Sequence, residues 1–177
     1  MSDRIQHLFF SRQYEEGMAL AAASDVLKLT AEPHVDAPPR RYVATFLCNT
    51  LVEAGGRVAR ANRVVVGIAF PEHYLHEASS YEVLNILHPS TIFHPNIRFP
   101  FICVGDLFMR PGTKLVEILY QVHAILTYSK WSANSPLCEA AAQWARQHQD
   151  ELPCDRRPLK RRTLDLRISL HSQGSQP

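Results

Sequence analysis

One stretch decides the fold of this chain: His94-Pro95-Asn96-Ile97-Arg98-Phe99-Pro100-Phe101-Ile102-Cys103. A turn-forming His-Pro-Asn opens it, and an apolar run closes it on a single cysteine. A strand-like segment precedes the stretch and a strongly periodic helix follows it. We therefore interpret Cys103 as a nucleophile that the rest of the chain presents. The alternative is that this isolated thiol fills the core, which is the commoner role of a free cysteine.

The composition is that of one globular domain. The chain has 177 residues, of which 46% are hydrophobic and 20% charged, enough for a single core. The formal net charge of +2 gives no case for nucleic acid or a membrane surface as partner. No apolar run approaches the roughly 18 residues that span a bilayer, and no secretory leader is evident. We expect a cytoplasmic protein with reduced thiols.

The four cysteines lie far apart and form no CxxC pair. No metal site and no cofactor is therefore expected, despite nine histidines. Cys48 lies in an apolar strand pattern and is expected to be buried. Cys138 falls in the first turn of a predicted helix, where burial is favoured over activation by the helix dipole. Cys154 is the exposed competitor to Cys103, but nothing around it resembles a transfer site.

The order of elements predicts an α+β fold. Residues 3–24 show helical spacing and capping. Four strand patterns follow, joined by short links with no helix between them, which favours an antiparallel meander. These strands are predicted at 26–32, 42–52, 63–70 and 81–87.

Two helices and a basic tail are predicted after Cys103. Apolar residues at i, i+3, i+4, i+7 and i+11 from Leu115 mark the first helix. Ser135-Pro136 predicts the start of the second, with the hydroxyl at the N-cap and proline at N1. Strict alternation over 164–170 predicts an extra strand in the tail. We divide the chain into a domain at 1–153 and a basic, partly disordered extension at 154–177.

Several motifs in this order resemble those of the ubiquitin-conjugating (E2) family. Phe70-Pro71-Glu72-His73-Tyr74 resembles the Phe-Pro-x-x-Tyr that ends the family's third strand. Thr91-Ile92-Phe93-His94-Pro95-Asn96-Ile97 matches the segment that carries its His-Pro-Asn motif, and Ile102-Cys103 matches its active-site Ile-Cys. Pro136-Leu137, with Glu139 after it, resembles the start of the next helix. The resemblance covers about residues 3–150 and implies a UBC-like fold.

The chain also departs from the family's pattern, and it looks like the divergent E2-like proteins of bacterial ubiquitin-like conjugation (antiphage) operons. Cys103 follows Asn96 by seven residues, one fewer than the usual spacing. The loop after Cys103 lacks the usual tryptophan, and Leu75-His76-Glu77 replaces a proline-rich loop. In the family, that loop and the one at Arg110-Pro111-Gly112 dock RING-type ligases, so the resemblance does not extend to that docking.

The resemblance implies a transferase. Such an enzyme accepts a ubiquitin-like protein from an E1-like activating enzyme as a thioester, here on Cys103, and passes it to an amine on a target protein. Thiolate is both a good nucleophile and a good leaving group, so no catalytic histidine need stand beside it. The alternative is a catalytically inactive binding or scaffold module of the same fold. An unrelated thiol hydrolase would need a positioned histidine, which the pattern lacks.

The resemblance also assigns roles around Cys103. Asn96 either stabilises the oxyanion through its side-chain amide or bonds to the loop backbone and holds its shape; both interpretations stay open. His94 and Pro95 are interpreted as supports of the loop. Ser135 aligns with a family position near the attacking lysine, where it would orient the acceptor. Its alternative role is a plain N-cap.

Two basic surfaces are candidates for partner contact. Arg4 and Arg12 lie on the first helix, which in the family docks the activating enzyme, although a solvated helix face would look the same. The basic run of the tail consists of Arg156, Arg157, Lys160, Arg161 and Arg162. A solvated linker is the commoner role of so short a run, but the strand pattern beyond it favours docking on a partner's sheet edge.

Overall fold

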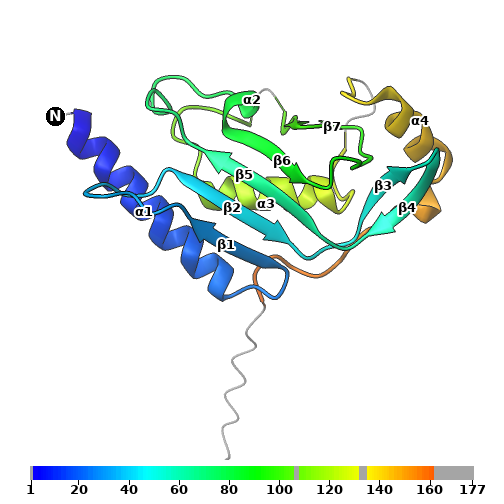
Figure 1. Cartoon of the computed structure of the whole chain (residues 1–177), viewed down its shortest axis with the longest axis horizontal. Coiled ribbons are helices and arrows are strands. Elements are labelled where there is room, and N and C mark those ends of the chain that lie inside the picture. Colours follow the sequence, from blue (N-terminus) through cyan, green and yellow to red (C-terminus); the bar gives the residue numbers. More distant parts are fainter. Residues whose placement is uncertain (1, 106–107, 132–134, 162–177) are drawn as a thin grey trace, which may run out of the picture.

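An antiparallel sheet of six strands forms the centre of the molecule (Figure 1). The computed structural model describes residues 2–105, 108–131 and 135–161. The strand order is β1-β2-β5-β6-β8-β7. The four longer strands are neighbours in the order in which the chain makes them, so the predicted antiparallel meander is confirmed. The strands of this sheet are β1 (Leu27–Ala31), β2 (Arg41–Phe46), β5 (Val64–Ala69), β6 (Leu84–His88), β7 (Ile97–Arg98) and β8 (Phe101–Ile102).

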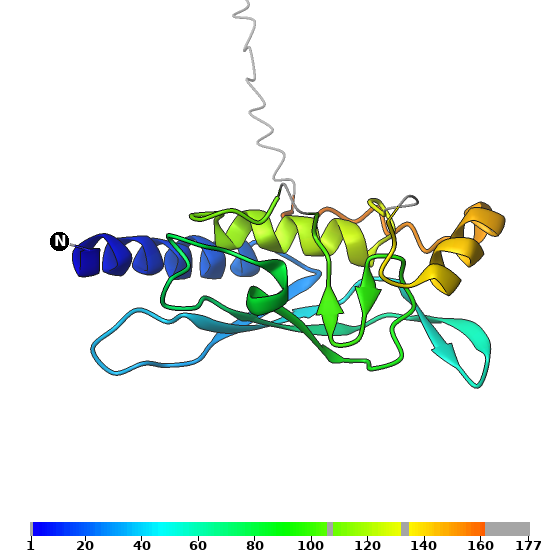
Figure 2. The same cartoon turned by 90° about the horizontal axis from the view of Figure 1, so that it is seen from above.

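Two long helices, α1 (Ser2–Ala22) and α3 (Leu115–Leu126), lie side by side on one face of the sheet (Figures 1 and 2). The backbone N–H of Leu115 donates to Gln13 Oε1 at 2.8 Å, which satisfies one free donor at the start of α3. A Cβ at Gly17 would lie 2.7 Å from the Leu115 side chain. Gly17 therefore weakens α1 locally but allows the close approach of the two helices.

The strand predicted at 42–52 is in fact two strands that belong to two sheets. β2 ends at Phe46, and β3 (Thr50–Ala54) pairs instead with β4 (Arg57–Ala61), which the sequence analysis missed. Phe46, Cys48 and Thr50 are all fully buried, so the alternation of inward side chains continues through the break. That unbroken alternation is why the pattern predicted one strand.

The fourth predicted strand, at 81–87, also begins later than expected. A single helical turn, α2 (Ser80–Val83), comes first and leads directly into β6. The Ser79 side chain caps this turn by accepting the backbone N–H of Tyr81. Apolar residues of a one-turn helix and of a strand look alike in so short a segment, so periodicity could not separate them.

The prediction that Ser135 caps the last α-helix is wrong. Helix α4 begins four residues later, at Glu139, with Cys138 at its N-cap, and ends at Gln147; a 3₁₀ turn, η1 (Gln149–Glu151), follows. The N–H groups of Leu137 and Cys138 donate to Pro95 O at 2.8 and 3.1 Å, which holds this segment against the His-Pro-Asn loop. α4 packs with the β3–β4 hairpin in a second, smaller core that includes Leu51, Phe93, Tyr128, Ala141 and Ala145.

Residues 154–161 form a strap that returns to the main domain. Leu159 is buried in the main core, and the Asp155 side chain is only 4% exposed. Asp155 accepts from the backbone N–H of Asn49 at 3.2 Å and pairs with Arg157 at 2.6 Å. Arg157 also donates to Leu47 O at 2.7 Å, so the strap holds the backbone in the segment between β2 and β3. The strand predicted at 164–170 lies outside the described residues.

We expect Arg157→Gln to lower the free energy of unfolding by about 1–3 kcal/mol, because it leaves the buried Asp155 carboxylate without its cation. The Arg157 guanidinium lowers the pKa of Asp155 to about 2, so the pair contributes above about pH 4 and its contribution is lost as the pH falls towards 2. Urea unfolding at pH 7 measures the loss. Arg156→Gln, at an exposed neighbouring site, is the control; equal losses in both variants would contradict the expectation.

Candidate functional site

Cys103 is half-buried between two fully buried neighbours. Ile102 and Val104 are 0% and 1% exposed, so both side chains anchor the backbone in the core. The side-chain amide of Gln121, from α3, donates to Val104 O at 2.9 Å. The N–H of Cys103 itself donates to Asn96 O at 2.8 Å. The thiol is thus fixed from both sides while it keeps access to solvent.

A two-stranded hairpin, β7–β8, links the His-Pro-Asn turn to the cysteine. It brings Asn96 and Cys103 together at its open end, where Asn96 Nδ2 donates to Cys103 O at 3.2 Å. The backbone N–H of Asn96 donates to His94 Nδ1 at 3.0 Å. Cys103 follows Asn96 by only seven positions, and the segment includes Pro100, yet it closes into this hairpin. The Asn96 side chain therefore does hold the loop backbone.

His94 is a buried support of this loop. Its side chain is 0% exposed and lies against the Tyr128 ring, with ring centroids 4.3 Å apart. Burial lowers the pKa of His94 to about 3, and the backbone carbonyl of Ile125 opposes that shift. The imidazole is therefore neutral near pH 7 and lacks the second ring proton that an imidazolium could donate as a general acid. Pro95 is buried beside it, and its carbonyl receives the two N–H groups that precede α4.

His94 should make the protein sensitive to acid. The folded pKa lies below the unfolded value of about 6.5, so the unfolded state takes up the proton first. Its stabilising contribution is present above about pH 6.5 and falls by up to about 1.4 kcal/mol per pH unit as the pH drops towards 3. We expect the free energy of unfolding of His94→Asn to change less between pH 6.5 and pH 4 than that of the wild type. The exposed His88→Asn is the control, and an unchanged slope in His94→Asn would contradict the expectation.

Ser135 is exposed and belongs to the segment that Pro95 holds. Two residues after it, Leu137 is bonded to the His-Pro-Asn loop, so this loop joins the Cys103 hairpin to the approach to α4. The structure thus brings the Asn96, Cys103 and Ser135 segments together around one loop. Cys138, and not Ser135, is the N-cap of α4.

The other three thiols differ from Cys103 in their surroundings. Cys48 is fully buried, as expected, and burial together with the nearby Asp155 carboxylate raises its pKa to about 12. Cys138 is half-buried and packs against the second core. Cys154 is exposed, as expected, and lies in the strap. Cys103 differs from Cys48 in being partly exposed, and from Cys138 and Cys154 in the hydrogen bond that joins its backbone to the Asn96 side chain.

Two side chains that hold the site were missed in the sequence. Tyr128, just after α3, donates its hydroxyl proton to Phe93 O and carries the ring that packs on His94. Its backbone has φ of 57°, a conformation that nothing in the local sequence indicates. Gln121 is one of three polar residues of α3, with Glu117 and His123, so the sequence pattern does not single it out.

We expect Tyr128→Phe to lower the free energy of unfolding by about 1–3 kcal/mol, because it removes the hydroxyl partner of the buried Phe93 carbonyl while keeping the ring. Since Phe93 leads directly into the His-Pro-Asn turn, amide hydrogen exchange at Asn96 and Ile97 should also become faster. Tyr120→Phe, at a tyrosine that is 43% exposed on α3, is the matched control. If both variants unfold alike, the hydroxyl does not support the loop.

The turn that ends β5 and the loop after Cys103 are joined by one buried tyrosine. Tyr74 is 0% exposed, stacks near Phe70 with centroids 4.6 Å apart, and donates its hydroxyl proton to Thr113 O at 2.7 Å. The aromatic residues of the Phe-Pro-x-x-Tyr segment therefore belong to the core. They also fix the loop that carries Arg110-Pro111-Gly112 relative to the sheet.

The basic residues predicted to meet partners fall into two groups. Arg4 and Arg12 are both exposed on α1, and Arg12 pairs with Glu16 at 2.8 Å. In the strap, Arg161 is engaged within the chain, as Arg157 is: its backbone N–H donates to Ala23 O at 2.8 Å and its guanidinium to Ala22 O at 3.0 Å. Arg156 and Lys160 are exposed, and Arg162 lies outside the described residues.

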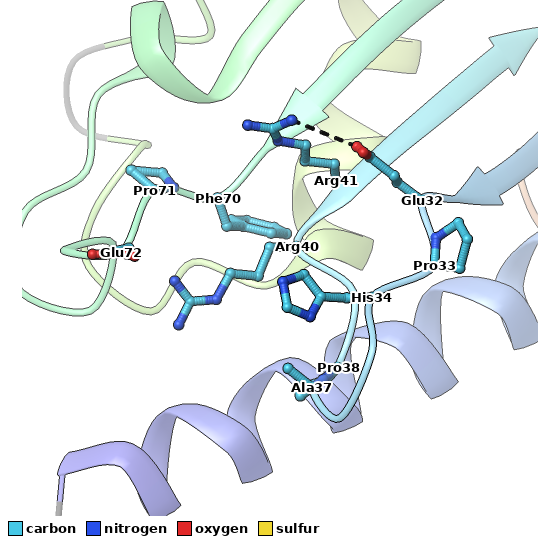
Figure 3. Close-up of a pocket in the computed structure, with 10 residues that line it drawn as sticks. All are labelled: Glu32, Pro33, His34, Ala37, Pro38, Arg40, Arg41, Phe70, Pro71 and Glu72. Atoms are coloured by element: carbon cyan, nitrogen blue, oxygen red, sulfur yellow. Dashed lines mark ion pairs between the residues drawn. The ribbon is translucent and has the colours of Figure 1, made fainter.

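A hollow of about 560 Å³ lies beside the loop between β1 and β2 (Figure 3). Its wall carries charges of both signs, including Arg41 and Glu32, which pair at 3.7 Å. Arg40, also in the wall, is engaged with α1: it donates to Gln6 Oε1 at 2.9 Å and lies 4.6 Å from the Phe10 ring centroid. None of the candidate site residues lines this hollow, so we do not assign the transfer chemistry to it.

Comparison with known proteins does not assign this chain to a family. No protein-family model matches the chain, and no curated protein is significantly similar to it. Within residues 2–105, 108–131 and 135–161, no cluster of three or more His, Cys, Asp or Glu side chains is arranged to hold a metal ion. The same described residues contain no helix that is both long and apolar enough to cross a membrane.

Proposed function

We propose that this protein is an E2-like conjugating enzyme with a UBC-like fold that acts in the cytoplasm. It accepts a ubiquitin-like protein from an E1-like activating enzyme as a thioester on Cys103 and transfers it to an amine of a target protein. The observation that carries this proposal is the setting of Cys103: an accessible thiol on an anchored backbone, with the Asn96 amide bonded across the hairpin to its carbonyl.

The chemistry needs two acyl transfers. In the first, the Cys103 thiolate attacks the thioester carbonyl of the activated ubiquitin-like protein, and the thiolate of the activating enzyme leaves. In the second, a neutral amine attacks the new thioester, the Cys103 thiolate leaves, and the amine nitrogen loses a proton to water. Neither step changes an oxidation state, and each begins from an activated acyl group, so an exposed thiol is sufficient.

The supporting residues divide between shape and contact. His94 and Pro95 fix the loop, and the neutral, buried imidazole agrees with a structural role. Ser135 is proposed to meet the acceptor amine, because it is exposed on a segment bonded to Pro95. Arg4 and Arg12 are proposed to contact the activating enzyme. Arg156 and Lys160 are the exposed basic side chains of the strap that remain available to a partner.

The direct test mixes the full chain with an E1-like enzyme, a β-grasp ubiquitin-like protein and ATP. We expect genes for these two proteins and a metallopeptidase beside the gene for this chain, as in bacterial antiviral conjugation operons. The expected result is a higher-mass adduct that needs ATP and disappears under a thiol reductant. If the cognate pair charges the activating enzyme but no adduct forms on this chain, the inactive scaffold of the same fold is the better explanation.

A further inference from the structure

A groove of about 350 Å³ lies between α1 and α3. Its lining includes Glu16, Ala19 and Leu20 of α1, Ala23 just after that helix, and Val116 and Tyr120 of α3. The first four follow the helical spacing i, i+3, i+4 and i+7, and the two α3 residues follow i and i+4, so one continuous stripe on each side faces the groove.

The groove exposes apolar surface that the described chain does not cover. Tyr120 is 43% exposed, Ala19 is exposed, and Val116 and Ala23 are half-buried. The charged group on its α1 wall, Glu16, is already paired with Arg12 at 2.8 Å. The rest of the groove surface is mainly apolar, with a tyrosine on its rim. An apolar segment can fill this groove.

The described part of the chain ends at this groove. Lys160 lines it, and the backbone N–H of Arg161 donates to Ala23 O at 2.8 Å. The Arg161 guanidinium adds a bond to Ala22 O at 3.0 Å and an ion pair with Asp25 at 3.6 Å. Three interactions of Arg161 thus hold the chain at the end of the groove, with sixteen residues of sequence still to follow.

We propose that residues 164–170 of this same chain occupy the α1–α3 groove. Their sequence, Leu164-Asp165-Leu166-Arg167-Ile168-Ser169-Leu170, places an apolar side chain at every second position. In an extended segment those side chains share one face, while Asp165, Arg167 and Ser169 share the other. The segment therefore has one apolar face for the groove and one polar face for water. This inference does not depend on the chemistry of Cys103.

The reach of the chain after Arg161 and the spacing of its apolar side chains agree with the length of the groove. Leu164 is three positions after Arg161, with two residues between them, and that stretch spans at most about 10 Å. The α1 wall from Glu16 to Ala23 is also about 10 Å long at 1.5 Å per residue. Alternate side chains of an extended segment are about 7 Å apart, so the groove accommodates two neighbouring members of the apolar set at once. Because the segment is tethered at the groove, its local concentration far exceeds that of a free partner.

The test is a disulfide trap in the full chain. Ala19→Cys and Leu166→Cys are combined in a background with Cys103, Cys138 and Cys154 replaced by serine, which leaves only the buried Cys48. Tyr14→Cys with Leu166→Cys is the control pair, because Tyr14 is 39% exposed on the same helix but does not line the groove. Under mild oxidation we expect the Ala19–Leu166 pair to close at least tenfold faster than the control, within monomers.

Each other outcome overturns the proposal. Disulfide-linked dimers of the Ala19 pair would mean that a second copy of the chain occupies the groove. Equal rates of disulfide formation for both pairs would mean that residues 164–170 do not prefer the groove. A readout without new cysteines is amide hydrogen exchange in α1: Leu166→Asp should speed exchange at Leu20–Ala23, and the polar-face variant Ser169→Asp should not. Unchanged exchange in Leu166→Asp overturns the proposal.

Discussion

Cys103→Ala is expected to abolish the reductant-sensitive adduct completely, because the proposed thioester needs the Cys103 thiol as its acyl acceptor. Cys48 is buried with a pKa raised to about 12, so its thiolate is absent near pH 7. The measurement is a non-reducing gel of a charging reaction, with the adduct mapped by mass spectrometry. Thermal unfolding of the variant should stay close to that of the wild type, since the thiol is half-buried at the surface.

Cys154→Ala is the matched control, since Cys154 is the more exposed thiol. It should leave the adduct unchanged in amount and rate. Cys103→Ser offers a second check, because a serine at this position can form only an oxygen ester, which thiol reductants do not cleave. An adduct that survives Cys103→Ala and disappears in Cys154→Ala would show that the strap, and not the hairpin, carries the reaction.

Elements whose apolar periodicity is long and regular were predictable from the sequence. α3 begins and ends with its predicted apolar stripe, and β1, β2, β5 and β6 pair as a meander because each has one buried face. Prediction failed where tertiary contacts decide the backbone. The break after Phe46 is stabilised by Arg157, more than a hundred residues away, which donates to Leu47 O. A contact between residues so far apart in the chain leaves no signal in the local sequence pattern.

The site shows the same division. The sequence places the His-Pro-Asn turn and Cys103 only seven residues apart, but it did not predict the β7–β8 hairpin that brings them together. Ser135 was misinterpreted, since Ser-Pro is a good start for an isolated helix. In the folded chain the carbonyl of Pro95 takes the N–H groups of Leu137 and Cys138, and α4 starts after them. A contact from outside the helix overrode a correct local preference.

Asn96→Ala is expected to lower the rate of transfer from the Cys103 thioester to an amine by about 10²-fold, the usual cost of losing a preorganised donor at an acyl-transfer site. It should also lower the free energy of unfolding by about 1 kcal/mol, because the amide donates to Cys103 O at 3.2 Å. Single-turnover discharge of preformed thioester onto free lysine measures the first effect. Urea unfolding measures the second.

The two roles of Asn96 separate in these measurements. If the side chain only holds the hairpin, charging and discharge should fall together and by no more than the stability loss explains. If it also stabilises the oxyanion, discharge should fall much further, and Asn96→Asp, which keeps the size but replaces the NH₂ donor with an acceptor, should be at least as slow. Arg98→Ala, exposed on the same hairpin, controls for nonspecific effects. Discharge within twofold of the wild type in Asn96→Ala would leave the residue with the backbone role alone, as the hydrogen bond to Cys103 O already provides.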